Sequence, residues 1–149
     1  MDQNDPFAHL FLKEYDQWEL FLHEQQYPYI GRCYAWSKND DKRPCTYMSS
    51  DEREELFRIV LPDWEVACNL NFKHDWTNIA SLGNTMPRLH WHFIPRYYQP
   101  VPFEGIEFID KNPTGNYSPY EKKAVDPAVV QKVISLMKEQ LFLAPSESV

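Results

Sequence analysis

The sequence has few glycines and no long apolar run. Its 149 residues include 4 Gly, which lie too far apart for a P-loop or for the glycine fingerprint of a dinucleotide-binding fold: Gly31, Gly83, Gly105 and Gly115. No apolar run approaches the roughly 18 residues of a membrane-spanning helix. The first nine residues carry acids where a secretory signal carries basic residues. These absences argue against both phosphate-binding glycine loops and against a membrane partner, and they predict a cytoplasmic protein.

Cysteine and positive charge are also scarce. The three cysteines, Cys33, Cys45 and Cys68, are odd in number and form no C-x-x-C pair, so a disulfide framework or a zinc knuckle is not expected. The 15 Lys+Arg against 22 Asp+Glu give a net charge of −7, which repels duplex nucleic acid. A small anionic ligand held by a local basic group is compatible with this balance. No motif in the sequence indicates a cofactor, and none is expected.

The remaining composition is that of a folded domain with stiff loops. Hydrophobic residues make up 43%, aromatic residues 15%, and there are 12 Pro. No internal repeat or composition shift marks a linker. We therefore expect a single domain over residues 1–149, with a core at about 17–97 and a C-terminal loop and helix over 98–143.

The order of elements follows from periodicity and capping signals. Asp5 and Pro6 predict a short helix over 7–14. Alternating aromatic residues predict a strand hairpin over 18–23 and 29–36. A capping box of Ser49 and Glu52 starts a helix over about 50–71, which Pro62 should disturb.

Two further strands, 76–82 and 89–97, flank a turn. Residues 99–125 show no periodicity and predict a long loop, after which Asp126 caps a last helix and the residues beyond 145 should fray. Along the second strand one face is expected in the core and the other is expected to carry the chemistry. The core face holds Leu89, Trp91, Phe93 and Pro95, and the opposite face holds Arg88, His90, His92 and Ile94.

His90 and His92 lie two residues apart on that second face, so their imidazoles converge. Neutral imidazole is both a nucleophile and a metal ligand near neutral pH. A plain amphipathic strand with two half-exposed histidines is one alternative. A zinc site is another, but it needs further ligands, and the nearest in sequence, His74 and Cys68, lie at no diagnostic spacing. We therefore expect no metal.

The segment from Gly83 to Arg96, Gly-Asn-Thr-Met-Pro-Arg-Leu-His-Trp-His-Phe-Ile-Pro-Arg, resembles the signature of the histidine triad (HIT) proteins. In that family a Gly-Gln-Ser/Thr stretch precedes His-x-His-x-His and an apolar pair. The resemblance implies an α+β fold: an antiparallel five-stranded sheet with a main helix packed on it and a C-terminal helix. It also implies a homodimer.

The resemblance assigns roles residue by residue. His90 falls on the central nucleophilic histidine and His92 on the third. Arg88 stands where the first histidine is usual, as in a bacterial HIT-like subgroup. Asn84 takes the place of the usual glutamine, and Thr85 keeps the usual hydroxyl.

Two upstream residues are similar to substrate-binding positions of the family. Glu24 corresponds to the acid that grips the ribose hydroxyls, and Asn78 corresponds to a pocket asparagine. The implied function is a nucleotide hydrolase or nucleotidyl transferase that acts on a nucleoside phosphate ester, a phosphoramidate or a dinucleoside polyphosphate through a nucleotidyl-histidine intermediate. The alternative is a nucleotide-binding regulatory module with little turnover, because Arg88 and Asn84 depart from the pattern.

Overall fold

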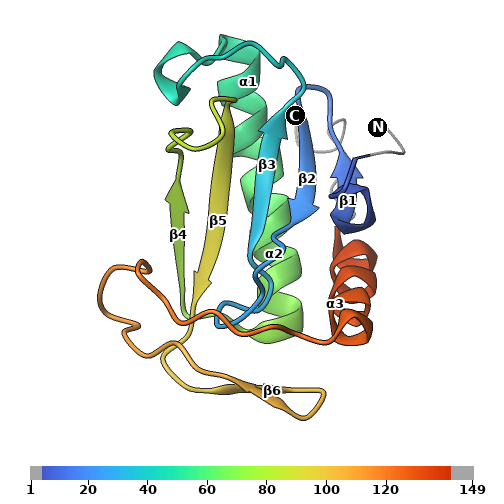
Figure 1. The fold of residues 1–149 in the computed structure, drawn as a ribbon. Helices are drawn as coiled ribbons and strands as arrows, with labels where there is room; N and C mark the ends of the chain where they lie inside the picture. The colour runs from blue at the N-terminus through green and yellow to red at the C-terminus, as the bar shows by residue number, and fades with distance from the viewer. Residues whose placement is uncertain (1–4, 142–149) are drawn as a thin grey trace.

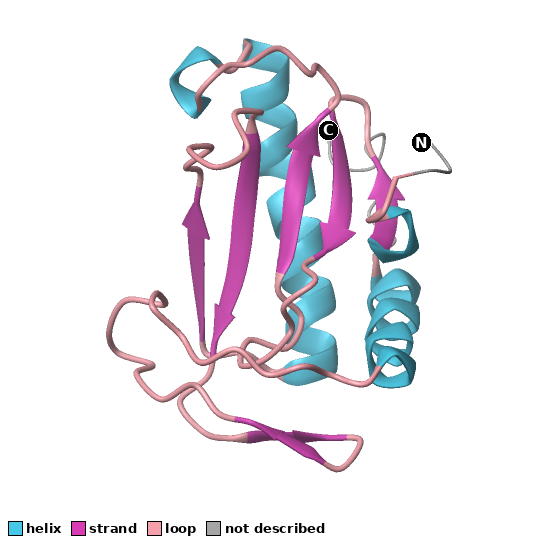
Figure 2. Ribbon diagram, in the orientation of Figure 1, coloured by secondary structure: helices cyan, strands magenta, loops and turns pink. Residues whose placement is uncertain are grey.

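The computed structural model describes residues 5–141, which form one five-stranded antiparallel sheet with helices behind it (Figures 1 and 2). The strand order is β1-β2-β3-β5-β4, and every neighbouring pair is antiparallel. The strands are β1 (Phe11–Glu14), β2 (Trp18–Leu22), β3 (Cys33–Ser37), β4 (Trp76–Ala80) and β5 (His90–Arg96). The sheet and helices confirm the predicted α+β fold.

The main helical segment runs behind the sheet from residue 50 to residue 72. It consists of α1 (Ser50–Glu55), a π-helical turn η3 (Leu56–Val60) and α2 (Leu61–Phe72). Both hydrogen bonds of the predicted capping box are present between Ser49 and Glu52. The π turn ends two residues before Pro62, whose ring nitrogen has no hydrogen to donate to the preceding turn. The expected disturbance therefore takes the form of a widened turn inside a continuous helix.

The core lies between the sheet and this helical segment. Trp64 of α2 packs on Phe93 of β5 with ring centroids 5.4 Å apart, and Trp18 donates from its indole to the Glu52 carbonyl at 2.9 Å. All three of these aromatic rings are fully buried, since their residues have no exposed surface. Truncation of such side chains typically costs about 3–5 kcal/mol, so this face holds the fold together.

The C-terminal helix α3 (Pro127–Gln140) packs beside α2 and β1. Asp126 caps it by accepting from the Ala128 amide at 2.8 Å, as the sequence predicts. Its buried side consists of Val133, Ile134 and Met137. The predicted end of this segment at 143 and the fraying beyond 145 lie outside the described residues. The division at about residue 97 stays a prediction.

Two predictions about local structure are wrong. Residues 7–14 contain only a 3-10 turn, η1 (Ala8–Leu10), followed by β1, because Leu10 and Leu12 alternate into the core and the edge of β2 offers hydrogen-bonding partners. The segment 99–125 includes a small hairpin, β6 (Val101–Phe103) and β7 (Ile106–Phe108). Its strands have three residues each, too few to show a period.

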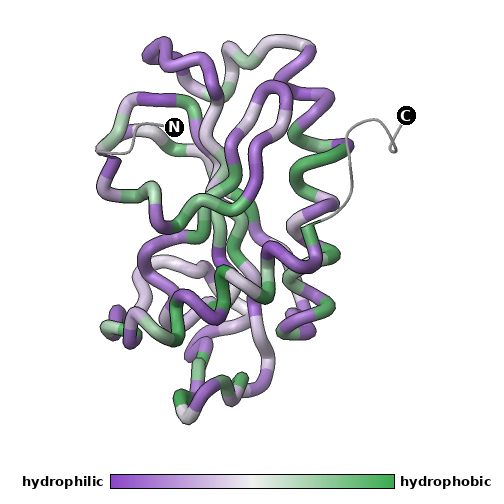
Figure 3. Tube along the Cα trace, turned by 90° about the vertical axis from the view of Figure 1, so that its right-hand side faces the viewer, coloured by the Kyte–Doolittle hydropathy of each residue, from purple (hydrophilic) through white to green (hydrophobic). Residues whose placement is uncertain are grey.

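Hydrophilic and hydrophobic positions alternate at short intervals along the trace, as expected for elements that bury one side only (Figure 3). No helix within residues 5–141 is long and apolar enough to cross a membrane.

Candidate functional site

The helices cover one face of the sheet and leave the other face open (Figure 1). Aromatic and imidazole side chains contact one another on the open face. Directly paired residues of antiparallel strands project from the same face, so the register defines two rows across the sheet. The first row is Glu19, Trp36 and His90, and the second is Phe21, Tyr34 and His92. Both histidines therefore lie on the face of β5 opposite to the buried Phe93, as the alternation predicts.

His90 holds its imidazole in one tautomer. Its Nδ1 lies 2.7 Å from the backbone carbonyl oxygen of Arg88, and a carbonyl only accepts, so Nδ1 carries the hydrogen. Nε2 then has a free lone pair and no hydrogen-bonding partner among residues 5–141. The ring stacks on Trp36 at 4.0 Å, with an interplanar angle of 18°. Burial lowers the pKa of His90, so the ring is neutral near neutral pH.

His92 has the opposite tautomer. A guanidinium donates only, so the contact from Arg32 Nη2 to His92 Nδ1 at 3.3 Å requires an unprotonated Nδ1 and a hydrogen on Nε2. Burial, together with the charge of Arg32, lowers the pKa of His92 to about 3. The ring lies parallel to Tyr34 and 5.0 Å from His90. His92 is thus a neutral hydrogen-bond donor beside the neutral imidazole of His90.

Sequence reasoning missed two members of this cluster, His23 and Arg32. His23 lies 5.6 Å from His92, and burial with the nearby Arg32 charge lowers its pKa to about 2. Arg32 also donates to the Tyr120 hydroxyl at 3.0 Å and lies over the rings of Tyr117 and Tyr120. The period-two pattern could have found His23 and Arg32, because they continue the alternation of Phe21 and Tyr34.

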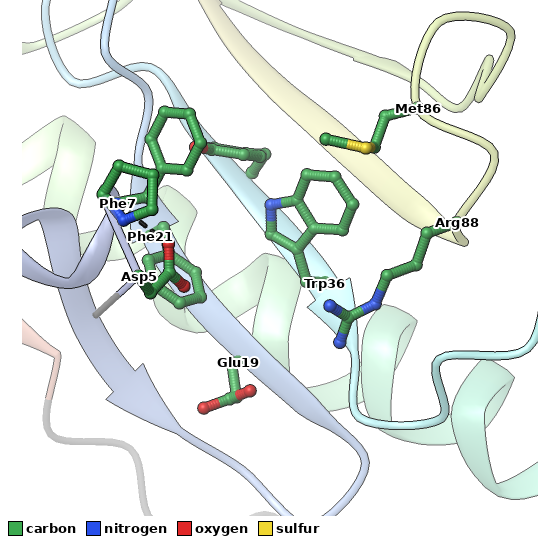
Figure 4. A pocket seen from close by; sticks show the side chains of 9 residues that line it. Asp5, Phe7, Glu19, Phe21, Trp36, Met86 and Arg88 are labelled. Atoms are coloured by element: carbon green, nitrogen blue, oxygen red, sulfur yellow. Dashed lines mark hydrogen bonds between the residues drawn. The ribbon is translucent and has the colours of Figure 1, made fainter. Parts of the chain in front are cut away.

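Arg88, whose carbonyl holds His90, also lines a pocket of about 470 Å³ (Figure 4). It donates to the Ser37 carbonyl at 2.8 Å and its guanidinium lies 5.5 Å from the centre of the Trp36 ring. The other lining residues are Asp5, Pro6, Phe7, Glu19, Phe21, Tyr34, Trp36 and Met86. The pocket therefore has aromatic walls, one cation and two carboxylates. His90 and His92 do not line it, but they stack on two of its walls, Trp36 and Tyr34.

Glu24 and Asn78, the two predicted substrate-binding residues upstream of residue 83, lie in different parts of the structure. Glu24 follows β2, is exposed, and accepts from the Tyr34 hydroxyl at 3.3 Å, which places it at the end of the open face that carries His92. Asn78 on β4 accepts from Arg96 Nη1 at 3.0 Å and lines a separate hollow at the far end of β5. The structure brings Glu24 near the second row of the site and does not bring Asn78 near the pocket.

Asn84 and Thr85 lie exposed in the loop between β4 and β5. Asn84 lines a second hollow of about 250 Å³ together with Lys42 and Arg43, and Arg88 lines both hollows. Neither Asn84 nor Thr85 lines the aromatic pocket. Arg88 is thus the residue that separates the aromatic pocket from the loop.

The alternative metal ligands do not join the histidine pair. His74 packs against Trp64, and Cys68 is fully buried with its Sγ 3.8 Å from the Tyr97 hydroxyl. Within the described part of the chain, no group of three His, Cys, Asp or Glu side chains could hold a metal ion.

The sequence matches no family model and no curated protein. Solved structures do match. A histidine triad protein from Bradyrhizobium japonicum superposes with a TM-score of 0.68 at 19% identity, over 89% of this chain and 90% of that chain. A hypothetical histidine triad nucleotide-binding protein from Sulfolobus tokodaii strain7 gives 0.67 at 16% identity, over 89% and 83%. A histidine triad protein from Marinobacter aquaeolei VT8 gives 0.65 at 17% identity, over 94% and 95%.

These similarities establish the fold. The chain has the fold of histidine triad proteins over nearly the whole of its length, as the resemblance of residues 83–96 predicts.

Proposed function

We propose that this protein binds a nucleotide on the open face of the sheet and transfers its nucleotidyl group to His90. The observation that carries the proposal is the fixed tautomer of His90, whose Nδ1–H is held by the Arg88 carbonyl and whose Nε2 lone pair is unengaged. A nucleophilic histidine needs this arrangement. The neighbouring histidine triad structures include one described as nucleotide-binding, which agrees with this reading.

In the first step the Nε2 lone pair attacks the α-phosphorus. A P–N bond forms, the bond from phosphorus to the leaving group breaks, and the electron pair departs with the leaving group. The imidazole becomes a cation, and its Nδ1–H bond to the Arg88 carbonyl strengthens. His92, with its Nε2–H, would donate to a non-bridging oxygen as negative charge builds there.

In the second step water attacks the same phosphorus. The P–O bond forms, the P–N bond breaks and returns its electron pair to Nε2, and the water proton is lost to solvent. The product is a nucleoside monophosphate. An acceptor hydroxyl in place of water would make the protein a transferase.

Arg88 favours leaving groups that depart as anions. A guanidinium neutralises phosphate charge but stays protonated, so it is a poor general acid. Phosphoanhydrides, as in dinucleoside polyphosphates, should therefore react faster than phosphoramidates, whose amine must be protonated as it leaves.

The substrate-binding roles follow from placement. We propose that Glu24 accepts hydrogen bonds from the ribose hydroxyls, since its exposed carboxylate lies next to Tyr34 in the second row. Asn84 and Thr85 would bind phosphate oxygens from the loop. Asn78, which Arg96 engages, would act on the substrate indirectly, by fixing the end of β5.

The test is single-turnover labelling with nucleotides that carry phosphorus-32 at the α-position. An acid-labile, base-stable protein adduct is expected with the wild type and no adduct with His90→Asn. Nucleotide binding without an adduct would favour the regulatory module. Turnover on a panel of adenine and guanine nucleotides with different leaving groups then defines the reaction, and a metal analysis of the purified protein tests the metal-dependent alternative.

We further propose a cytoplasmic homodimer. The outer edge of β4 pairs with no strand in the described sheet, and apolar side chains are exposed beside it: Val66, Leu70 and Trp76. A second copy would cover them. All three cysteines are free, which fits a reducing compartment. Light scattering that gives a monomer at micromolar concentration would contradict the dimer.

A further inference from the structure

The carboxylate of Glu19 is the feature of the aromatic pocket that the mechanism leaves unused. Glu19 lies on β2 in the same row as Trp36 and His90, and its side chain points into the pocket (Figure 4). It is half-buried, and residues 5–141 offer it no hydrogen-bonding or ionic partner. The other carboxylate of the pocket, Asp5, already accepts from the Phe7 amide at 2.9 Å.

The walls of the pocket suit a flat ring. Phe21, Tyr34 and Trp36 contribute aromatic surface from two neighbouring strands, and Phe7 contributes it from the N-terminal segment. Every nucleobase has a π-face, so stacking of this kind binds bases without distinguishing them. Discrimination among bases has to come from a polar group at the edge of the stack. Glu19 is placed at that edge.

The distance from the reacting imidazole fits a nucleotide. Glu19 is separated from His90 by two strand spacings, or about 10 Å across the sheet. This is comparable to the length of a nucleoside monophosphate from its phosphorus to the far edge of its base. A phosphate at His90 therefore places the base within reach of Glu19.

We infer that Glu19 selects guanine, an inference that rests on the proposed nucleotidyl transfer. An ionised carboxylate offers two adjacent acceptors and no donor. Guanine presents two adjacent donors, N1–H and the 2-amino group, along one edge. Adenine presents a single amino donor next to the N1 lone pair, which a carboxylate repels. Uracil presents one N–H between two carbonyl oxygens.

The test measures binding of GMP, IMP and AMP by calorimetry with the full chain, because monophosphates have no leaving group to lose. GMP should bind about tenfold or more tightly than AMP, since one hydrogen bond to a charged group accounts for that factor. IMP lacks the 2-amino group and should fall between them. In Glu19→Gln and Glu19→Ala the affinity for GMP should fall toward that for AMP, while the affinity for AMP stays within about threefold.

Glu54→Gln is the matched control, because Glu54 is an exposed carboxylate on α1, behind the sheet, that pairs with Arg58 at 3.3 Å and does not line the pocket. It should keep the preference for GMP. Equal binding of GMP and AMP by the wild type, or a preference for GMP that survives Glu19→Ala, would overturn the role of Glu19 and leave the proposed function standing. No binding of any of the three nucleotides would overturn the proposed function itself.

Discussion

His90 and Arg96 stand at opposite ends of β5 on one face of the sheet, and they differ in how completely their hydrogen-bonding groups are used. All five N–H groups of Arg96 donate within the described chain: to both oxygens of Asp110, to Asn78 and to two backbone carbonyls. His90 uses Nδ1 and leaves Nε2 unengaged. A buried polar group whose hydrogen bonds are all satisfied contributes to stability. A nitrogen whose lone pair is unengaged can still bind or react with a ligand.

The polar side chains at the two ends of β5 have different surroundings. Both ends of the strand are polar and both belong to the segment 83–96, yet Arg96 ties the crossing loop at 110–115 to the sheet and touches no part of the aromatic pocket. His90 and Arg96 are distinguished by their hydrogen-bonding partners, rather than by residue type or by position in the motif.

The largest expected effect is at the chemical end. His90→Asn removes the nitrogen that we propose attacks phosphorus, so turnover should fall by several orders of magnitude, on the scale of nucleophile losses in other covalent enzymes. Nucleotide Kd should stay within about tenfold and Tm should change little, because the core side of β5 is untouched. Measured kcat, Kd and Tm check this. Near wild-type turnover would remove His90 from the nucleophile's role.

At the Arg96 end of β5, a substitution should lower the stability of the protein. Asp110→Ala leaves the buried Arg96 guanidinium without its ionic partner, and loss of one member of a buried pair costs about 3–5 kcal/mol. Urea unfolding measures this. Glu121→Gln is the control, because it breaks only the exposed pair with Lys111, which solvent screens, and should leave the free energy of unfolding close to that of the wild type. Equal losses of unfolding free energy in Asp110→Ala and Glu121→Gln would contradict the expected difference between the buried and the exposed ion pair.

His92 should give an intermediate effect. His92→Asn removes a supporting donor and keeps the nucleophile, so kcat should fall about 10- to 100-fold. The adduct should still form in single-turnover labelling. A His92 variant more damaged than the His90 variant would reverse the assignment of the nucleophile.

The neutral imidazoles should make stability depend on pH. The pKa of His23 is about 2 in the folded protein and about 6.5 when unfolded, so below pH 6.5 the unfolded chain binds a proton that the folded chain does not. The free energy of unfolding should therefore fall with decreasing pH, by about 2 kcal/mol at pH 5 for this group. In His23→Gln that decrease should be smaller. Urea unfolding at pH 7 and pH 5 compares the two proteins, and parallel pH profiles would contradict the prediction.

The smallest effect is expected for Arg88→His. A titratable imidazole replaces a permanent cation, so activity on phosphoramidates should rise, by less than the roughly hundredfold of a fully positioned general acid. Activity on phosphoanhydrides should not rise. Loss of activity on every substrate in a folded variant would show that Arg88 itself contributes to the reaction.

The sequence alone predicted the elements whose signals are local. The capping box of Ser49 and Glu52, the alternation along β5 and the Asp126 cap each depend on residues within a few positions of one another, and all three are present in the structure. The prediction of a helix over 7–14 was wrong because the strand there forms only through pairing with β2, and the local sequence carries no signal of that pairing.

What only the tertiary structure decided is the set of neighbours around those residues. Arg32 reaches His92 across 60 positions of sequence, and Glu19 enters the row of His90 through two strand pairings. The tautomers of His90 and His92, the full engagement of Arg96 and the separation of Asn78 from the pocket all follow from such contacts. Period and composition fix which face a side chain takes, but its partner across the sheet depends on register, which is set by the packing of the whole domain.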